Sequence, residues 1–362
     1  MRGELSRRTA GMMRPPTASS LQTPAAGIAN RRELIAHLVA IHVPDAVIMQ
    51  LLARDGVTPA TAERQIQRGH ADLHFARRVL HAERRRVAWH HGIEAKLSRL
   101  TRPRGGIERV PYRSVKDVRR YYAANQPAIF TGMCARWNAL GWTPQTFSRR
   151  FGREWIDVEV RRGHLTDIFL GEEVSHRRVQ FAAFVEAVER GDADSGYLVS
   201  KNDLLKDPRF AELFDDLTPL PKILDPALLR RQTSLWLGRR GTVTELHHDG
   251  NNNLFIQLHG RKRFRLVPRY ALEQVYASAG VWSANRFCSP NDPGFPAARG
   301  MEVIDLVLEP GEALLIPVGW WHFVVALDVS IGLSLTGFYW PNDYGDSRDP
   351  IAWDEMPAAG AE

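Results

Sequence analysis

The sequence predicts a mainly β fold with helices, preceded by an α-helical N-terminal domain. Beyond about residue 105, short runs rich in β-branched and aromatic residues alternate with Gly- and Pro-containing turns, a pattern typical of strands. Between residues 28 and 100, apolar residues instead recur at helical spacing. With 362 residues, 44% hydrophobic and 25% charged, the protein is long enough to form one large globular domain and a smaller one.

Changes of composition predict the domain boundaries. Residues 1–27 contain one acidic residue among Arg, Ser, Thr, Pro and Ala, and they lack the apolar centre of a signal peptide, so we expect a disordered tail. A Pro- and Gly-rich linker near residue 104 separates a basic helical domain, 28–104, from a larger domain, 105–345. Residues 346–362 are expected to form a C-terminal tail.

The helical domain is indicated by capping signals as well as by periodicity. A first helix covers the apolar residues between 34 and 41, and a second starts near Pro44. Gly56 predicts the end of the second helix, and Pro59 the start of a third. A long basic helical pattern then runs to about Leu100. We expect this domain to mediate homodimerisation or to bind a partner peptide.

Most of the positive charge lies in this N-terminal third. The net charge is +7, of which residues 1–27 carry about +3 and residues 28–104 about +7, so the remainder is slightly acidic. A solvated basic helical face explains this charge better than polynucleotide binding does. Two short helices around Gly56 would also fit a helix-turn-helix, but no recognition helix can be identified, so nucleic acid is not the expected partner.

Cysteine content and hydropathy predict the compartment. Cys134 and Cys288 are far apart and too few for a disulfide framework, which favours a reducing environment. No run of 18 apolar residues is present, so no membrane span is expected. The sequence therefore predicts a cytoplasmic protein.

The most informative stretch for chemistry is residues 241–262. On a strand, His247 and Asp249 would project to the same side and His248 to the other. An imidazole and a carboxylate so placed are two of the three ligands of a facial triad that suits Fe(II). His322, which begins an apolar run after a turn, is the candidate third ligand. The alternative is a buried His–Asp pair and an unrelated histidine.

Lys262 is the second unusual residue of this stretch. On a strand it shares a face with Phe264, whereas Arg261, Arg263 and Arg265 share the other. A buried ammonium group is costly without an anionic partner, so a core-facing Lys262 would indicate a bound anion. The alternative is a charged run that faces solvent throughout.

The two histidine-containing stretches together resemble the paired metal-binding motifs of the cupin superfamily. The first motif places Gly241, His247, Asp249, Asn253 and Gly260 at the family's spacing, and the second does so with Gly311, Pro317, Gly319 and His322. An Asp at the second ligand position is similar to the JmjC-type 2-oxoglutarate oxygenases, in particular the cupin-like hydroxylases related to the asparaginyl hydroxylase of hypoxia-inducible factor. This resemblance covers about 107–341.

Further elements follow the same pattern before the first motif. These are a strand at 127–130, a helix opened by Thr143 and Pro144, a strand at 156–160, a helix at 181–188 and a strand at 197–199. The resemblance therefore implies a double-stranded β-helix, the jelly-roll core of the cupins, buttressed by helices.

Site residues are implied by the same resemblance. His247, Asp249 and His322 would bind Fe(II), and Lys262 would pair with the distal carboxylate of the cosubstrate 2-oxoglutarate. Thr244 and Tyr197 would hydrogen-bond that carboxylate, and Asn253 would lie beside the cosubstrate. The Asn that the family places on the last strand aligns with Gly337, and Thr336 is the neighbour that could substitute for it.

The implied activity is hydroxylation that consumes O2 and releases succinate and CO2. The resemblance favours a C–H bond in a side chain of a peptide or protein, with the β-carbon of Asn, Asp or His preferred. The same chemistry on a free amino acid or small metabolite is one alternative, and a metal-binding cupin without oxidative activity is another. The loop at 288–300 is expected to shape substrate access, and Trp282, Trp320, Trp321 and Trp340 to line a groove or to belong to the core.

Overall fold

The computed structural model describes residues 31–40, 45–71, 73–101, 106–160, 176–199, 202–277 and 281–345. The predicted tails, 1–27 and 346–362, lie outside these ranges. The chain forms two compact units, Met1–Glu94 and Ala95–Glu362, and each is described by itself.

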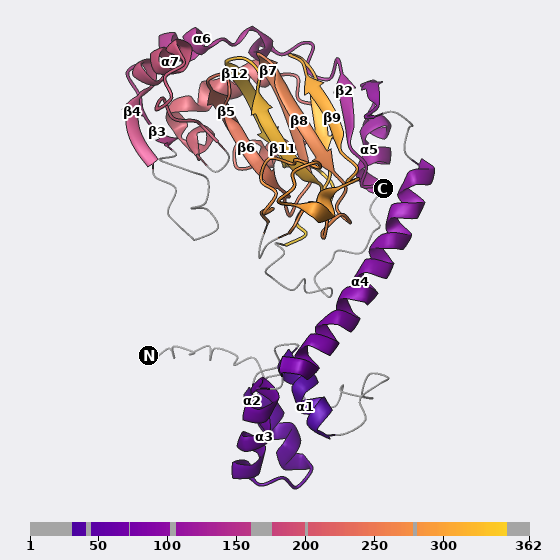
Figure 1. Ribbon diagram of the computed structural model, residues 1–362. Helices are drawn as coiled ribbons and strands as arrows, with labels where there is room; N and C mark the ends of the chain where they lie inside the picture. Colours follow the sequence, from indigo (N-terminus) through magenta and orange to yellow (C-terminus); the bar gives the residue numbers. More distant parts are fainter. Residues whose placement is uncertain are drawn as a thin grey trace, which may run out of the picture. The chain divides into compact units, whose positions relative to one another are not determined.

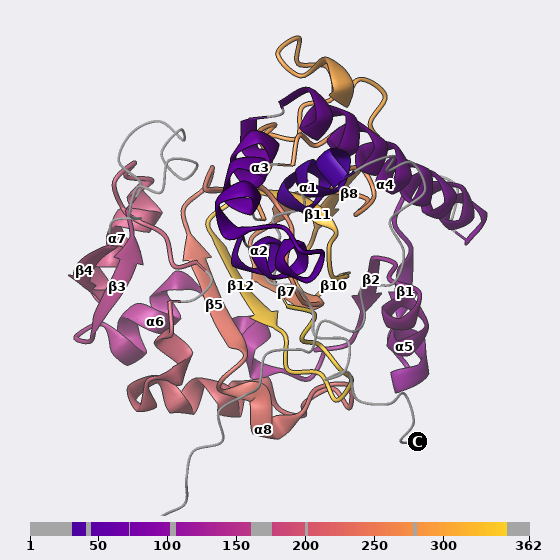
Figure 2. The same cartoon turned by 90° about the horizontal axis from the view of Figure 1, so that it is seen from below.

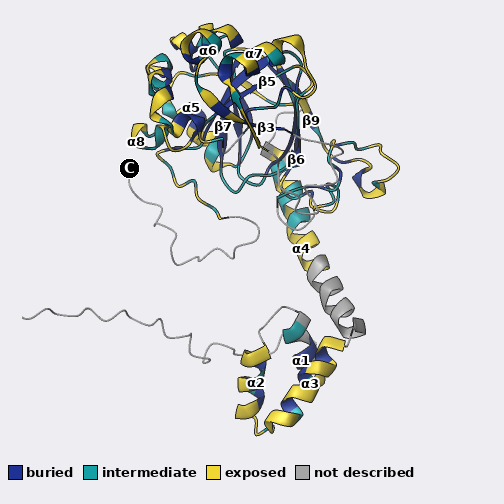
Figure 3. Ribbon diagram, turned by 90° about the vertical axis from the view of Figure 1, so that its left-hand side faces the viewer, coloured by how far each residue is buried: buried dark blue, intermediate teal, exposed yellow. Residues whose placement is uncertain are grey.

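The first unit is helical. It contains α1 (Arg31–Ala40), α2 (Asp45–Arg54), α3 (Pro59–Ala71) and the first part of α4 (Leu73–Thr101). As predicted, α3 starts at Pro59, and Gly56 adopts a positive φ of 76° just after α2. The buried faces of α1, α2 and α3 form a small core of Ile35, Ile48, Leu52, Ala62 and Ile66 (Figure 3).

The second unit is mainly β with helices, which confirms the predicted fold class. Two sheets dominate it (Figure 1), one with the strand order β1-β2-β10-β7-β12-β5 and the other with the order β6-β11-β8-β9. The six-stranded sheet consists of β1 (Arg109–Pro111), β2 (Ala128–Thr131), β5 (Thr233–Gly238), β7 (Asn253–His259), β10 (Ala313–Ile316) and β12 (Ser330–Leu335). The four-stranded sheet consists of β6 (Val243–His247), β8 (Lys262–Val267), β9 (Ile304–Leu308) and β11 (Trp321–Ala326).

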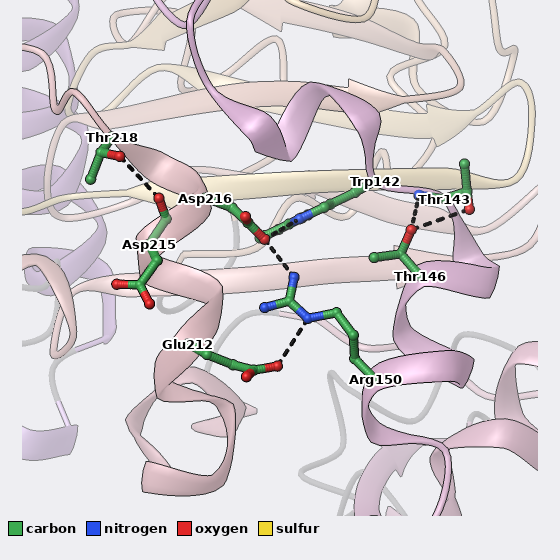
Figure 4. A network of polar contacts seen from close by, with 8 residues as sticks. All are labelled: Trp142, Thr143, Thr146, Arg150, Glu212, Asp215, Asp216 and Thr218. Carbon is green, nitrogen blue, oxygen red and sulfur yellow. Dashed lines mark hydrogen bonds and ion pairs between the residues drawn. The ribbon is translucent and has the colours of Figure 1, made fainter.

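Helices and a two-stranded antiparallel sheet lie around these sheets (Figure 2). They are α5 (Val115–Ala123), η1 (Asn138–Gly141), α6 (Pro144–Phe151), β3 (Trp155–Glu159), β4 (His176–Gln180), α7 (Phe181–Arg190), η3 (Leu204–Lys206), η4 (Pro208–Leu217), α8 (Pro226–Leu229) and η5 (Pro296–Ala298). The aromatic side chains of α6 and α7 join the core that also contains the apolar side chains of β2, β7 and β12. Polar contacts hold η4 against α6, because Arg150 pairs with Glu212 and Asp216, and Asp216 also accepts the indole N–H of Trp142 (Figure 4).

Most of the elements predicted before the first motif are present. The strand at 127–130, the helix from Pro144, the strand at 156–160 and the helix from Phe181 correspond to β2, α6, β3 and α7. The predicted strand at 197–199 is the exception, since Tyr197 and Leu198 form only isolated bridges to Glu159 and Leu237. Those bridges still fix Tyr197 beside β5.

Among the described residues, no helix has the length and apolar character that crossing a membrane requires. Both cysteines are buried and free. Burial raises the pKa of the Cys134 thiol to about 11 and that of the Cys288 thiol to about 12, so both stay protonated at neutral pH.

Candidate metal centre and adjoining pocket

Three side chains that could bind a metal converge where β6 and β11 pair. His247 is the last residue of β6, His322 lies opposite it on β11, and Asp249 follows β6 by two residues. One potential ligand atom from each residue lies within 4.8 Å of the others. His247 and Asp249 do lie together, as the sequence predicted, although β6 ends at His247 and Asp249 belongs to the connection between β6 and β7.

Backbone contacts orient both imidazoles toward the carboxylate. The Nδ1 atom of His247 lies 2.7 Å from the Glu245 carbonyl, and that of His322 lies 3.0 Å from the Trp320 carbonyl. A carbonyl only accepts, so each Nδ1 donates, and Nε2 is the ring nitrogen left on the side of the carboxylate. These Nε2 atoms lie 3.9 and 3.7 Å from the two Asp249 oxygens. This is how metal-binding histidines are commonly held.

Asp249 is kept in the state that a metal ligand needs. Burial alone would raise the pKa of its carboxyl, but His322, His247 and a hydrogen bond from Asn253 together lower this pKa below its usual value. The carboxylate is therefore ionised at neutral pH. Two imidazole nitrogens and one carboxylate form a donor set that fits Fe(II).

A β-bulge explains why Thr244 and His247 face the same pocket. In the pairing with β11, two residues of β6, Glu245 and Leu246, lie opposite a single one, Phe323. In a regular strand, residues three apart point to opposite faces. The extra residue returns His247 to the side that Thr244 already occupies, and both line the cavity.

The candidate metal centre opens into a cavity of about 470 Å³. Thr244, Asn253 and Lys262 line it together with the three candidate ligands, so the structure gathers six of the seven predicted site residues around one space. The other walls come from β5, β7, β8, β10, β11, β12 and nearby turns, namely Asp203, Lys206, Arg231, Gln232, Ser234, Trp236, Asn251, Phe255, Phe264, Ile316, Val324, Ser334, Thr336, Asn342 and Asp343.

Lys262 points into the core, as one of the two interpretations of its strand predicted. It is 1% exposed, and Phe264 on the same face is also buried, whereas Arg263 and Arg265 are partly exposed. Its Nζ donates a hydrogen bond of 3.0 Å to the hydroxyl of Tyr197, the seventh predicted residue. It also lies 4.9 to 5.6 Å from the ring centres of Phe255, Trp236 and Tyr197.

No carboxylate neutralises this lysine among the described residues. Cation–π contacts and one phenol offset part of the cost of burying an ammonium group, but a full charge so deeply buried usually has an anionic partner. The cavity beside it provides room for one. An anion is thus the ligand expected at this position.

Asn253 and the last strand form a second polar group. The hydroxyl of Ser334 on β12 donates to Asn253 Oδ1 at 2.8 Å, and Asn253 in turn contacts Asp249. Ser334 was missed in the sequence, where the family position was aligned with Gly337. Gly337 does not line the cavity, and a Cβ there would lie 2.9 Å from Leu228 Cβ. Thr336, the suggested substitute, does line it.

The predicted access loop and tryptophans lie elsewhere. None of the residues that line the cavity belongs to 288–300, and none of Trp282, Trp320, Trp321 and Trp340 is among them. Trp320 and Trp321 are buried in two separate cores. Trp282 instead packs against His247 in a tilted arrangement, with ring centres 5.0 Å apart.

Comparison with known proteins places this site in a family. The model of the cupin-like domain family matches residues 114–344, which includes every candidate site residue. That match covers well over half of the protein.

Several curated proteins are similar in sequence to this one. The protein is 28% identical over 235 residues to a protein from Arabidopsis thaliana named lysine-specific demethylase JMJ30, a match covering 62% of this chain and 52% of the relative. Lysine-specific demethylase 8 from Xenopus tropicalis is 26% identical, with 63% and 51% covered. Human HSPB1-associated protein 1 is also 26% identical, with 60% and 49% covered. The protein thus spans about half the length of these relatives.

Proposed function

Because the protein belongs to the JmjC-type cupin-like family, we propose that it is an Fe(II)- and 2-oxoglutarate-dependent oxygenase. The single observation that carries this proposal is the buried Lys262 beside a His–Asp–His site. A metal-binding cupin without oxidative activity would have no use for an unneutralised lysine at the base of its pocket. The two features together match a cosubstrate that is both a chelator and a carboxylate.

The three metal ligands would be His247, Asp249 and His322. The Nε2 atoms of the two histidines lie 3.9 and 3.7 Å from the Asp249 carboxylate, which is too far for a hydrogen bond. A metal could therefore bind between these atoms without breaking a hydrogen bond between them. The hydrogen bonds at Nδ1 hold the rings in place before a metal arrives. With Fe(II), 2-oxoglutarate and O2 bound, the site would couple decarboxylation of 2-oxoglutarate to succinate and CO2 with hydroxylation of a C–H bond.

The cosubstrate pocket would use the other predicted residues. Lys262 would pair with the distal carboxylate of 2-oxoglutarate, and Tyr197 and Thr244 would hydrogen-bond the same group. Asn253 and Ser334 would form the polar wall near Asp249. The rings of Trp236 and Phe255 would exclude water from the charged pair, which strengthens it.

A peptide or protein side chain is the proposed substrate, hydroxylated at the β-carbon of Asn, Asp or His. Relatives named as lysine demethylases support a protein substrate, whereas the preference for a β-carbon rests on the resemblance to the asparaginyl hydroxylase. Those names make removal of a lysine methyl group the second candidate reaction. Mass spectrometry of protein substrates separates the two, since hydroxylation adds one oxygen atom and demethylation removes a methyl group.

Turnover of 2-oxoglutarate tests the proposal without knowledge of the substrate. The Fe(II)-loaded full-length protein should form succinate slowly in air, and His247→Ala should form none. Arg263→Met is the control, because it removes a partly exposed arginine of β8 in the four-stranded sheet that also contains His247. This variant should keep the wild-type rate. Absence of succinate together with absence of 2-oxoglutarate binding would leave the metal-binding cupin as the better description.

The finer architecture is part of the same proposal. Eight successive strands, β5 to β12, supply the order β5-β12-β7-β10 in one sheet and β6-β11-β8-β9 in the other. This interleaving supports a double-stranded β-helix.

We also propose that the protein is cytoplasmic and that its N-terminal helices, with exposed Trp89 and Leu97 on α4, mediate a homodimer. Light scattering of the full-length protein, with Trp89→Glu/Leu97→Glu as the dissociated variant, tests the dimer.

A further inference from the structure

A buried ion pair lies behind the metal centre. Arg286 donates from Nε and Nη2 to the two carboxylate oxygens of Glu245, at 2.6 and 2.7 Å. The Glu245 side chain is 2% exposed and that of Arg286 is 14% exposed. Neither residue lines the cavity, so the pair has no part in the cosubstrate pocket.

The pair joins the bulge of β6 to a distant part of the sequence. Glu245 is one of the two bulge residues, and its carbonyl is the acceptor that orients the His247 ring. Arg286 belongs to residues 281–286, which we call the edge segment, in the long connection between β8 and β9. The pair therefore holds the residue whose backbone carbonyl accepts the hydrogen bond from the His247 ring.

The edge segment pairs with β6 by its backbone as well. β6 is the outermost strand of its sheet, and the edge segment lies along that edge. Leu246 N donates to Arg286 O at 2.8 Å, Ser283 N to Leu246 O at 3.0 Å, and His248 N to Val281 O at 3.0 Å. Without this segment, backbone N–H and C=O groups of the β6 bulge would lie unpaired at the edge of the sheet, where other segments could bind them.

Trp282 of the same segment limits the rotation of the His247 ring. The two rings are 5.0 Å apart with an interplanar angle of 33°, and the His322 ring lies 4.0 Å from His247. The edge segment therefore restricts the orientation of the His247 ring in two ways. It holds the bulge whose carbonyl accepts from this ring, and its Trp282 contacts the ring directly.

Stability alone is a poor explanation for this arrangement. A buried ion pair contributes little net free energy compared with apolar side chains of the same size, whereas its bidentate geometry fixes both partners closely. We propose that Glu245 and Arg286 form a positioning pair that holds the β6 bulge, and thereby His247, in the orientation that binds the metal. This inference rests on the proposed function, because it assigns His247 as a ligand.

Binding of Co(II) to the metal-free full-length protein, measured by calorimetry, tests the pair. Arg286→Met should raise the Kd for Co(II) about tenfold or more, the range seen when groups that orient metal ligands are removed. Arg263→Met is the matched control, because Arg263 makes a similar two-point contact with Asp305 in the same sheet but away from His247. Its Kd should stay within about twofold of wild type.

A second variant controls for misfolding, which Arg286→Met could cause because it leaves the Glu245 charge buried without its partner Arg286. Glu245→Gln/Arg286→Met removes both charges, and it should still bind Co(II) more weakly than wild type and alter the visible spectrum of the bound cobalt. Circular dichroism establishes that each variant is folded. Folded variants that bind Co(II) with wild-type affinity and spectrum would overturn the positioning pair.

The same titrations separate this inference from the proposed function. Wild-type binding that is lost in His247→Ala but kept in both pair variants overturns the positioning pair alone. Failure of the wild type to bind Co(II), or binding that survives His247→Ala, overturns the metal site and the positioning pair with it.

Discussion

At the scale of single residues, Asp249 is the only anionic member of the candidate metal site. It lies between two imidazoles, so its removal leaves a metal cation with no countercharge among its ligands. Asp249→Ala should therefore weaken Co(II) binding by at least about tenfold, as measured by calorimetry. Asp305→Ala, which removes an exposed carboxylate of β9, should leave binding unchanged.

Asp117 at the start of α5 predicts a pH effect on stability. Hydrogen bonds from the backbone N–H groups of Arg113 and Ser114 lower the pKa of its carboxyl below the usual value. A depressed folded-state pKa stabilises the protein above the unfolded pKa of about 3.9, and this contribution is lost as the pH falls through the folded-state value.

Unfolding in urea at a series of pH values measures that contribution. Wild type should be more stable than Asp117→Asn at neutral pH, and the difference should shrink as the pH falls below about 4. A difference that does not shrink on acidification would mean that the ionised carboxylate is not what stabilises this helix start.

Residue-scale prediction from the sequence succeeded where a local pattern contained the information. Alternation along β8 placed Lys262 and Phe264 on one face, with a solvent-facing run as the alternative, and Lys262 is buried. The two motif frames named three candidate ligands that lie together in the structure. Ser334 could not be found this way, since its role arises from pairing between β12 and β7, which brings it to Asn253. Trp236 was missed for the same reason, since nothing near it in the sequence indicates that it faces Lys262.

At the scale of elements, a glycine on β12 makes room for the aromatic rings around Lys262. A Cβ on Gly332 would lie 2.6 Å from Phe255 Cζ, which is too close for two carbon atoms. The Phe255 ring can therefore keep its position only because residue 332 has no side chain. Gly332→Ala should displace this ring, lower the free energy of unfolding by about 1–3 kcal/mol and weaken 2-oxoglutarate binding.

Urea unfolding and calorimetry measure both effects. Gly141→Ala is the control, because a Cβ there meets nothing within 4 Å. Equal effects of the two substitutions would show that the clash at Phe255 is relieved without moving the ring.

The strands show where periodic patterns stop being informative. A period of two predicted that His247 and Asp249 would lie on one side, and they do, but β6 ends at His247 and contains a bulge that this pattern did not indicate. The bulge is what brings His247 to the side of Thr244. The loop at 288–300 was expected to shape substrate access, but the neighbouring edge segment supports β6 instead, a role set by contacts between residues about 40 positions apart in sequence.

At the scale of the whole molecule, the fold class and the order of elements in 107–341 could be predicted because capping residues, turns and motif spacing are local. The N-terminal helices could be predicted as helices for the same reason. Their role could not be, because the function of a helical surface depends on what covers it. The boundary predicted near residue 104 falls beyond the end of α4, and the two compact units divide within that helix.

The proposed activity depends on Lys262 receiving a carboxylate of 2-oxoglutarate. Calorimetric titration of 2-oxoglutarate into the Co(II)-loaded full-length protein tests this directly, with Lys262→Met as the variant because methionine fills similar space without charge. Wild type should bind, and Lys262→Met should bind at least about 30-fold more weakly, as expected for loss of a buried charge pair. Equal affinity of the two folded proteins would contradict this role, since the buried lysine would then have no part in holding the cosubstrate.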